Sequence, residues 1–192
     1  MKKCLMAAML LVCFSFAAQA QRQQTYTVDE ALTRVSLTAG SSMSPGSKIA
    51  VISYETPTKT FSDYVGETLT YDLQTKIHRD VITYRNVDTI HRDYKITGAD
   101  ISDTKAIEIG KALKVDVVLL VNVKGLGSAY QMNVLTINVA SGKKGTPSRL
   151  NLKEDNVLTE LLKGPAVTEQ APAGAPVEGA VRRLRAMREA AS

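Results

Sequence analysis

Two histidines, each followed by an arginine and an aspartate, are the first residues of this chain whose types and order suggest chemistry. The triplets at residues 78–80 and 91–93 match the start of the catalytic loop of protein kinases. That loop also needs an asparagine five residues after its aspartate. This chain has Arg85 and Gly98 at those two places. It also lacks the glycine-rich phosphate loop, so the repeat does not indicate a kinase.

The other residue patterns that could support catalysis or cofactor binding are also incomplete. The two histidines and their neighbouring aspartates are a poor metal-ligand set, because each histidine stands beside an arginine, whose charge opposes a bound cation. No serine lies in the Gly-x-Ser-x-Gly turn of a hydrolase, and Gly125 and Gly127 lack the third glycine of a dinucleotide site. We therefore expect a non-enzyme without metal or cofactor. An active site assembled from residues distant in sequence stays open as the alternative.

Residues 1–20 have the three parts of a secretory signal: two early lysines, an apolar run over residues 5–18 and a small-residue end. We expect cleavage after Ala20 and export to the periplasm. An association with the outer membrane is compatible with this location. Lipidation at Cys13 is the rival interpretation. Val12 argues against it, because that cleavage needs a small residue before the cysteine.

Charge and cysteine content narrow the class of the exported chain. Removing Lys2 and Lys3 from 24 basic residues leaves 22 against 19 acidic residues, a net charge of +3. Such a small excess makes nucleic acid a poor candidate partner. Cys4 and Cys13 both lie in the signal, so the mature chain has no thiol and must obtain its stability from a packed core.

Residues 21–47 are predicted to form a leading helix and a connector. Thr27 and Glu30 make a capping box, and apolar residues then recur at helical spacing to about Ala39. Residues 40–46 are rich in glycine, serine and proline, which predicts a turn.

Residues 48–145 are predicted to form a single α/β domain, three-layer-like, with a mixed sheet flanked by helices. Gly125 and Gly127 mark a tight turn, which makes the last two strands an antiparallel hairpin. Gly110 is expected to allow close approach of a neighbouring element. The order is β-α-β-α-α-β-β, with strands at 48–54, 81–85, 115–123 and 130–139, and helices starting near Phe61 (capped by Thr60 or Ser62), Asn86 and Asp103.

The C-terminal part divides into three segments. Residues 146–164 contain a helix candidate at 151–163, and residues 165–176 have the Pro/Ala/Gly composition of a linker. Residues 177–192 form a basic amphipathic tail that could contact an anionic membrane surface or a partner groove. A frayed, solvated tail is the alternative. The candidate contact residues are Arg182, Arg183, Arg185 and Arg188.

Residues 48–143 resemble the soluble domain shared by the curli-secretion channel subunit (CsgG-like), the flagellar outer-membrane protein FlgO and the penicillin-binding-protein activator LpoB. The similarity includes the buried strand at 48–53 and the helix from 61–65 onward. Its most specific part is GADISD at 98–103 followed by IGKAL at 109–113. The resemblance continues into the apolar strand and a final strand that ends at Ser141 and Gly142.

The resemblance implies a non-enzymatic protein of the bacterial envelope that works by contact with other proteins. Three departures limit it. Channel members carry two long amphipathic hairpins, whereas every connector here is short, so a pore is not expected. Members are commonly lipoproteins, and this chain lacks a good lipid site. Residues 114–116 read Lys-Val-Asp where a Gly-Ala pair is usual, which puts that turn in question.

Two functions remain after these observations. The first is a periplasmic interaction protein that regulates cell-wall synthesis or supports envelope assembly, with a cell-wall synthase or an outer-membrane assembly protein as partner. The second is a structural ring subunit associated with the outer membrane, curli-type secretion or the flagellar base, which would require a homo-oligomer. The sequence alone does not name the partner.

Overall fold

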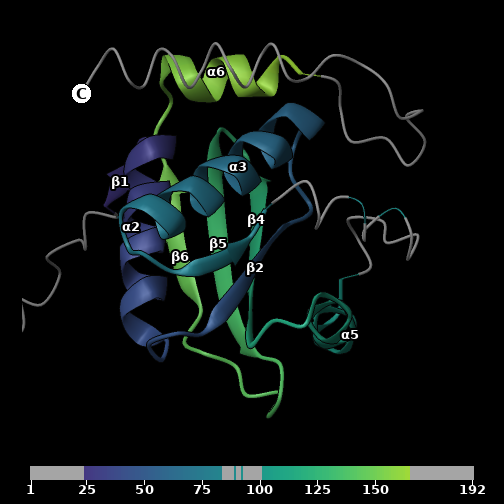
Figure 1. The fold of residues 1–192 in the computed structure, drawn as a ribbon. Coiled ribbons are helices and arrows are strands. Elements are labelled where there is room, and N and C mark those ends of the chain that lie inside the picture. Colours follow the sequence, from purple (N-terminus) through teal and green to yellow (C-terminus); the bar gives the residue numbers. More distant parts are fainter. Residues whose placement is uncertain (1–23, 84–88, 90–91, 93–100, 165–192) are drawn as a thin grey trace, which may run out of the picture.

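A six-stranded mixed sheet organises the computed structural model, which describes residues 24–83, 89, 92 and 101–164 (Figure 1). The strand order is β1-β6-β5-β4-β2-β3. The expected single α/β domain with a mixed sheet is confirmed. The elements are β1 (Thr25–Tyr26), α2 (Val28–Ser42), β2 (Lys48–Ser53), α3 (Lys59–Thr75), β3 (Asp80–Ile82), α5 (Asp103–Leu113), β4 (Val117–Leu126), β5 (Ala129–Asn138), β6 (Ser148–Leu152) and α6 (Asn156–Leu162).

Strand β4 occupies the middle of the sheet. It pairs in parallel with β2 and in antiparallel fashion with β5, over the full length from Val117 opposite Asn138 to Leu126 opposite Ala129. The predicted hairpin is therefore confirmed. Gly127 forms its turn with a φ of 67°, a conformation that glycine adopts without steric cost, whereas Gly125 belongs to the strand.

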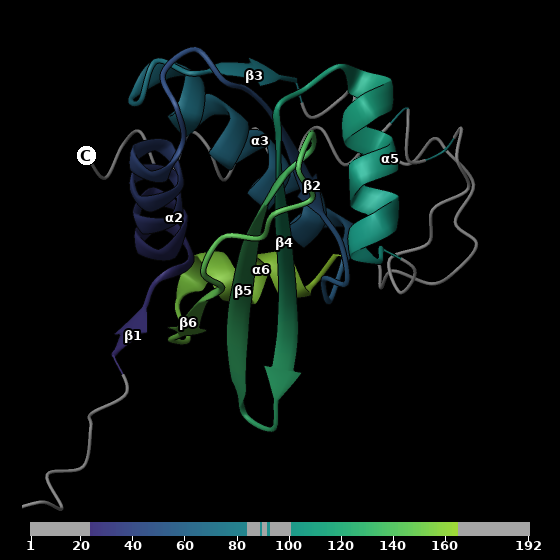
Figure 2. The ribbon, with the colours of Figure 1, turned by 90° about the horizontal axis from the view of Figure 1, so that it is seen from below.

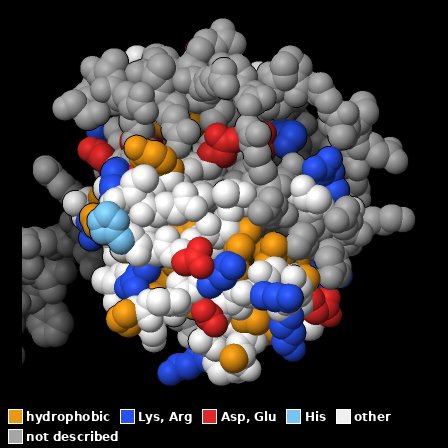
Figure 3. Space-filling model, in the orientation of Figure 1, with side chains coloured by type: hydrophobic (Ala, Val, Ile, Leu, Met, Phe, Trp, Pro, Cys, Tyr) orange, Lys and Arg blue, Asp and Glu red, His pale blue; other side chains and the backbone are white. Residues whose placement is uncertain are grey.

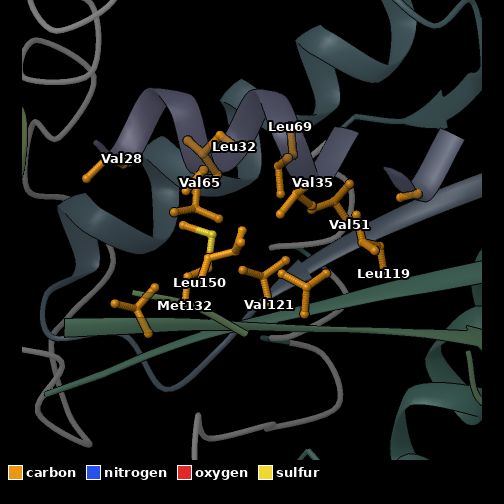
Figure 4. Close-up of a cluster of buried hydrophobic side chains, with 14 of the residues drawn as sticks. Val28, Leu32, Val35, Val51, Val65, Leu69, Leu119, Val121, Met132 and Leu150 are labelled. Atoms are coloured by element: carbon orange, nitrogen blue, oxygen red, sulfur yellow. The ribbon is translucent and has the colours of Figure 1, made fainter. Parts of the chain in front are cut away.

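Helices cover the two faces of the sheet in different ways. Buried residues of α2, α3 and α6 pack on one face, and those of α5 pack on the other. Figure 2 shows α2 and α5 on opposite sides of the strands. The larger core joins Leu32 of α2 and Val65 of α3 to Leu119, Val121 and Met132 of the sheet (Figure 4). This two-sided burial explains why β2 and most of β4 are continuous apolar runs.

The leading helix α2 begins as predicted and ends later. The Thr27 hydroxyl accepts a hydrogen bond from Glu30 N at 3.1 Å, and Thr27 N donates to the Glu30 carboxylate at 2.8 Å. The helix continues to Ser42, three residues beyond the predicted end at Ala39. The Arg79 guanidinium supports this extra turn, because it donates to the carbonyl of Gly40 at 2.6 Å and to that of Met43 at 3.2 Å.

Helix α3 is capped by Thr58, not by Thr60 or Ser62. The Thr58 hydroxyl accepts a hydrogen bond from Phe61 N at 3.1 Å and donates one to the Leu161 carbonyl at 2.5 Å. This buried side chain therefore satisfies the start of α3 and the last turn of α6 together.

Several predicted boundaries are wrong. Strand β3 ends at Ile82 instead of residue 85. The helix expected over residues 151–163 begins at Asn156, with Asp155 as its cap, and residues 151 and 152 belong instead to strand β6. That strand and the short β1 were not predicted, and both join the main sheet. The helix expected after Asn86 lies largely outside the described residues.

Gly110 confirms the expected close approach between α5 and the sheet. A Cβ atom at this position would lie 2.5 Å from Val139 Cγ2 and 2.9 Å from Val118 Cγ2. Contacts this short are repulsive, so an added methyl group forces strands and helix apart.

Replacing Gly110 by alanine is expected to lower the free energy of unfolding by roughly 1–3 kcal/mol, the usual cost of overpacking. The measurement is urea denaturation followed by circular dichroism. Gly125→Ala is the control, because the nearest atom to its new Cβ is 3.7 Å away. Adding Val139→Ala should restore part of the loss at Gly110. Equal stability of Gly110→Ala and the parent would contradict this packing.

Lys114 ends helix α5 in the left-handed conformation, with a φ of 54°. Its N–H donates to the carbonyls of Gly110 and Lys111, as expected for a helix that closes on a left-handed residue. The position therefore has the backbone geometry that favours glycine, although the side chain is lysine.

Lys114→Gly is expected to raise the free energy of unfolding by about 0.5–1 kcal/mol, because glycine adopts this conformation without a Cβ penalty. Lys111→Gly, inside the same helix, should instead lower it by about 1 kcal/mol. Thermal and urea unfolding of both variants provide the comparison. A loss of stability in Lys114→Gly would show that the strain does not exist.

Candidate protein-contact face

Some of the predicted site residues lie outside the described part of the chain, and others lie within it. The tail arginines Arg182, Arg183, Arg185 and Arg188 lie outside the described residues, as do His91 and Asp93 of the second triplet. In the first triplet, His78 and Asp80 are exposed, and Arg79 caps helix α2. The arginine therefore has a structural role at the end of α2.

Within residues 24–83 and 101–164, no three histidine, cysteine or acidic side chains gather as metal ligands. A search of the described helices for one long and apolar enough to cross a membrane also found none.

Polar side chains gather where strands β4, β5 and β6 extend past helix α5. Side chains alternate along a strand, and Val118, Leu120 and Ile137 face α5. Continuing that alternation places a second set on the same side, mostly polar and partly or fully exposed. We call this set the open sheet face: Lys124 and Leu126 of β4, Ala129, Gln131 and Asn133 of β5, and Arg149 and Asn151 of β6.

A hydrogen-bond network anchors this face to the end of β2. Asn133 Nδ2 donates to Asn122 Oδ1 at 2.9 Å, and Asn122 Nδ2 donates to Glu55 Oε2 at 3.3 Å. Lys124 Nζ reaches the same Glu55 oxygen at 2.8 Å. Tyr54 Oη also lies 3.5 Å from Asn122 Nδ2. The network joins side chains of β4 and β5 to the residues that follow β2, and so it holds this surface in place.

Glu55 is held in an unusual backbone conformation, with a φ of 45°. Its carbonyl accepts a hydrogen bond from Val123 N at 3.2 Å, while its carboxylate accepts from Asn122 and Lys124. Strained residues persist when their surroundings determine them this strongly, and they concentrate at functional sites. Glu55 also follows β2, and β2 lies between β3 and β4 in the sheet. The helix that leads from β2 to β3, α3, and the helix that precedes β4, α5, pack on opposite faces of the sheet. Such switch points are common places for binding sites.

Burial and charge alter two proton affinities in this network. Burial raises the pKa of Tyr54 above its ordinary value of 10.0, and the Glu55 carboxylate beside it raises that pKa further. The hydrogen bond and charge of Glu55 also raise the pKa of Lys124. Tyr54 is therefore neutral and Lys124 charged at neutral pH.

The face seen in Figures 1 and 3, which carries α3, has a different surface. Figure 3 shows its described part, where lysine, arginine, aspartate and glutamate side chains are interspersed. Several of these charges are paired within one helix, as Lys59 with Asp63 at 3.0 Å and Lys76 with Asp72 at 3.2 Å. Because these opposite charges are paired, the described part of this surface has little net electrostatic potential with which to attract a charged partner.

Sequence reasoning missed the open sheet face. Glu55 and Asn122 are separated by 67 residues, and their contact follows only from the β2–β4 pairing. One local signal was present. The alternation of polar and apolar residues from Arg149 to Leu152 is typical of a half-buried strand.

Glu55→Gln is expected to lower the pKa of Tyr54 towards its ordinary value, because one of the two groups that raise it loses its charge. Ultraviolet absorbance of the phenolate during a pH titration measures this. Subtracting the curve of Tyr54→Phe isolates Tyr54 from the other tyrosines. An unchanged Tyr54 titration in Glu55→Gln would contradict the geometry.

The same shift makes stability depend on pH. Since the pKa of Tyr54 is raised in the folded state, its contribution is complete below the unfolded value of about 10 and is lost as pH rises through the folded value. The free energy of unfolding should therefore fall less steeply in alkaline solution for Tyr54→Phe than for the parent chain.

Comparison with known proteins relates the fold to solved structures. No family model and no curated protein matches the sequence. The solution structure of Escherichia coli LpoB is similar with a TM-score of 0.57 and 16% identity, over 72% of this chain and 74% of that one. The C-terminal domain of LpoB from Salmonella enterica has a TM-score of 0.52 and 15% identity, over 64% and 96%.

The C-terminal domain of LpoB from Escherichia coli is similar to the same degree, with a TM-score of 0.52 and 16% identity, over 67% of this chain and 100% of that domain. Identities this low establish the fold alone. The resemblance to the curli-secretion channel subunit and to FlgO is not tested by these structures and stays a prediction. The chain has an LpoB-like fold.

Proposed function

We propose that this chain is an exported, non-enzymatic protein of the bacterial cell envelope that acts by contact with another envelope protein. The single observation that supports this most is the LpoB-like fold, which extends over most of the described residues. In the resembling family, that domain belongs to an activator of a penicillin-binding protein. Regulation of cell-wall synthesis is therefore the finer form of the proposal, and support of envelope assembly is the broader one.

The proposed location is the periplasm. It rests on the secretory pattern of residues 1–20 and on the absence of cysteine after Cys13. A thiol-free chain folds in an oxidising compartment without forming unwanted disulfides. The basic tail, with its four arginines at 182, 183, 185 and 188, is proposed as a second contact, to an anionic membrane surface or to the partner.

The open sheet face supports contact as the mode of action. Strands β4 and β5 leave the cover of α5 with exposed residues at Lys124, Leu126 and Ala129. Fixed strands lose little conformational entropy when a partner binds, which favours association. The Asn133–Asn122–Glu55 network holds their side chains in place before any partner arrives.

The test is chemical crosslinking in intact cells that encode the protein, with the full chain tagged at its C-terminus and produced at its native level. The matched control lacks residues 2–20 and is expected to stay in the cytoplasm. Mass spectrometry should recover envelope proteins, such as a cell-wall synthase or an outer-membrane assembly protein, with the parent chain and not with the control.

Recovery of the same unrelated proteins from both strains would overturn the proposal. A ladder of crosslinked copies of this chain, without another envelope protein, would also overturn it. That second result would support the structural ring subunit, for which oligomerisation is essential.

A further inference from the structure

The hairpin of β4 and β5 projects beyond the rest of the described molecule. Figure 2 shows the two strands running past α5 to a tip that no other labelled element reaches. Leu126 stands at that tip with 56% of its surface exposed, the largest value among the exposed large hydrophobic residues. Ala129 lies opposite it and is also exposed. Leu126 and Ala129 therefore give the tip a small apolar area beside a polar surface, and protein interfaces combine apolar centres with polar rims.

The charges on the open sheet face are unequal. Lys124 and Glu55 neutralise each other at 2.8 Å. Arg149 is exposed on β6, and its guanidinium makes no ion pair or hydrogen bond within the described part of the chain. The face therefore presents one uncompensated guanidinium, whose planar donors match a carboxylate in two parallel hydrogen bonds.

Amide groups surround this arginine. Asn133 is its cross-strand neighbour on β5, and Gln131 Nε2 donates to Asn151 Oδ1 at 2.9 Å in the next row. These pairs fix the side chains and leave a surface that offers both hydrogen-bond donors and acceptors. Such a surface suits the mixed polar edge of a protein, where each amide can find a complementary group.

We propose that the open sheet face docks an acidic segment of the envelope partner, with a carboxylate of that segment on Arg149 and an apolar side chain against Leu126. This inference rests on the proposed function and adds the chemistry of the partner. Lys124 keeps its ion pair with Glu55 and lies at the periphery of the contact. The interaction gains specificity from the arginine and contact area from the hairpin.

The charge of the open sheet face also distinguishes an acidic protein segment from two other candidate partners, a second copy of this chain and a phosphate-rich surface. A second copy docked through the same face in a symmetric dimer would offer Arg149 only the Glu55 carboxylate, which Lys124 and Asn122 already hold. A phosphate-rich surface needs several basic side chains in a row, whereas the open sheet face has Arg149 and one already paired lysine. An acidic protein segment is the occupant that fits both observations.

The experiment places a photo-crosslinking amino acid at Gln131 of the full chain in living cells, with Leu37 on α2 as the control position. Leu37 is exposed on the helical side. Illumination should give one major adduct from position 131 and not from position 37. Its crosslinked partner peptide, identified by mass spectrometry, should contain aspartate or glutamate.

Charge variants then test Arg149 itself. Arg149→Glu should lower the adduct yield by at least about tenfold, the change expected when one member of a close charge pair is lost. Arg149→Lys should keep only part of the yield. Lysine preserves the positive charge, but it lacks the guanidinium group that binds a carboxylate through two parallel hydrogen bonds. Lys111→Glu, the same charge reversal on exposed α5, should leave it unchanged. Replacing the partner's acidic residue by arginine should restore the adduct with Arg149→Glu.

Unchanged yield in Arg149→Glu, a crosslinked peptide without carboxylates, or an adduct of two copies of this chain would overturn the inference. Equal thermal unfolding midpoints of the purified variants show that their folds are intact. If position 131 gives no adduct while whole-protein crosslinking still recovers an envelope partner, the docking face is wrong and the proposed function stands. If neither experiment finds an envelope partner, both are wrong.

Discussion

Strand β4 is paired on both edges and buried on both faces for most of its length, and the other elements are arranged around it. Its parallel pairing with β2 requires crossover connections through helices, which supply the two hydrophobic cores. Its antiparallel pairing with β5 needs only the turn at Gly127, so these two strands are free to be longer than their neighbours. The extra length is what takes the hairpin beyond α5.

This difference in length connects the fold to the proposed mode of action. Where α5 covers the sheet, the residues beneath it are apolar, and where it does not, Asn122, Asn133 and Lys124 replace them. A polar network in place of a second helix keeps the uncovered strands ordered. The same scaffold thus combines a tightly packed centre with an ordered polar surface, which the proposed function uses for contact.

Much of the fold was predictable because its signals are local. The capping box at Thr27 and Glu30, the apolar run of β2 and the glycine at 110 each act over a few residues or through a simple packing requirement. Strand β6 was not predicted, and the expected helix began at its last two residues, because the alternation within this five-residue strand is too short to exclude a helix. The open sheet face was missed for a different reason, because Glu55 meets Asn122 only after β2 and β4 have paired.

The sequence by itself determined the α/β class, the antiparallel hairpin and the absence of a recognisable catalytic motif, because periodicity, turn residues and residue types decide these locally. Tertiary structure decided which polar residues lie together. Among the described residues, the Arg149 guanidinium has no partner while Lys124 has one, and this depends on the register of β4, β5 and β6, which follows from the packing of both cores. A one-residue shift in that register would turn the same side chains to the opposite face.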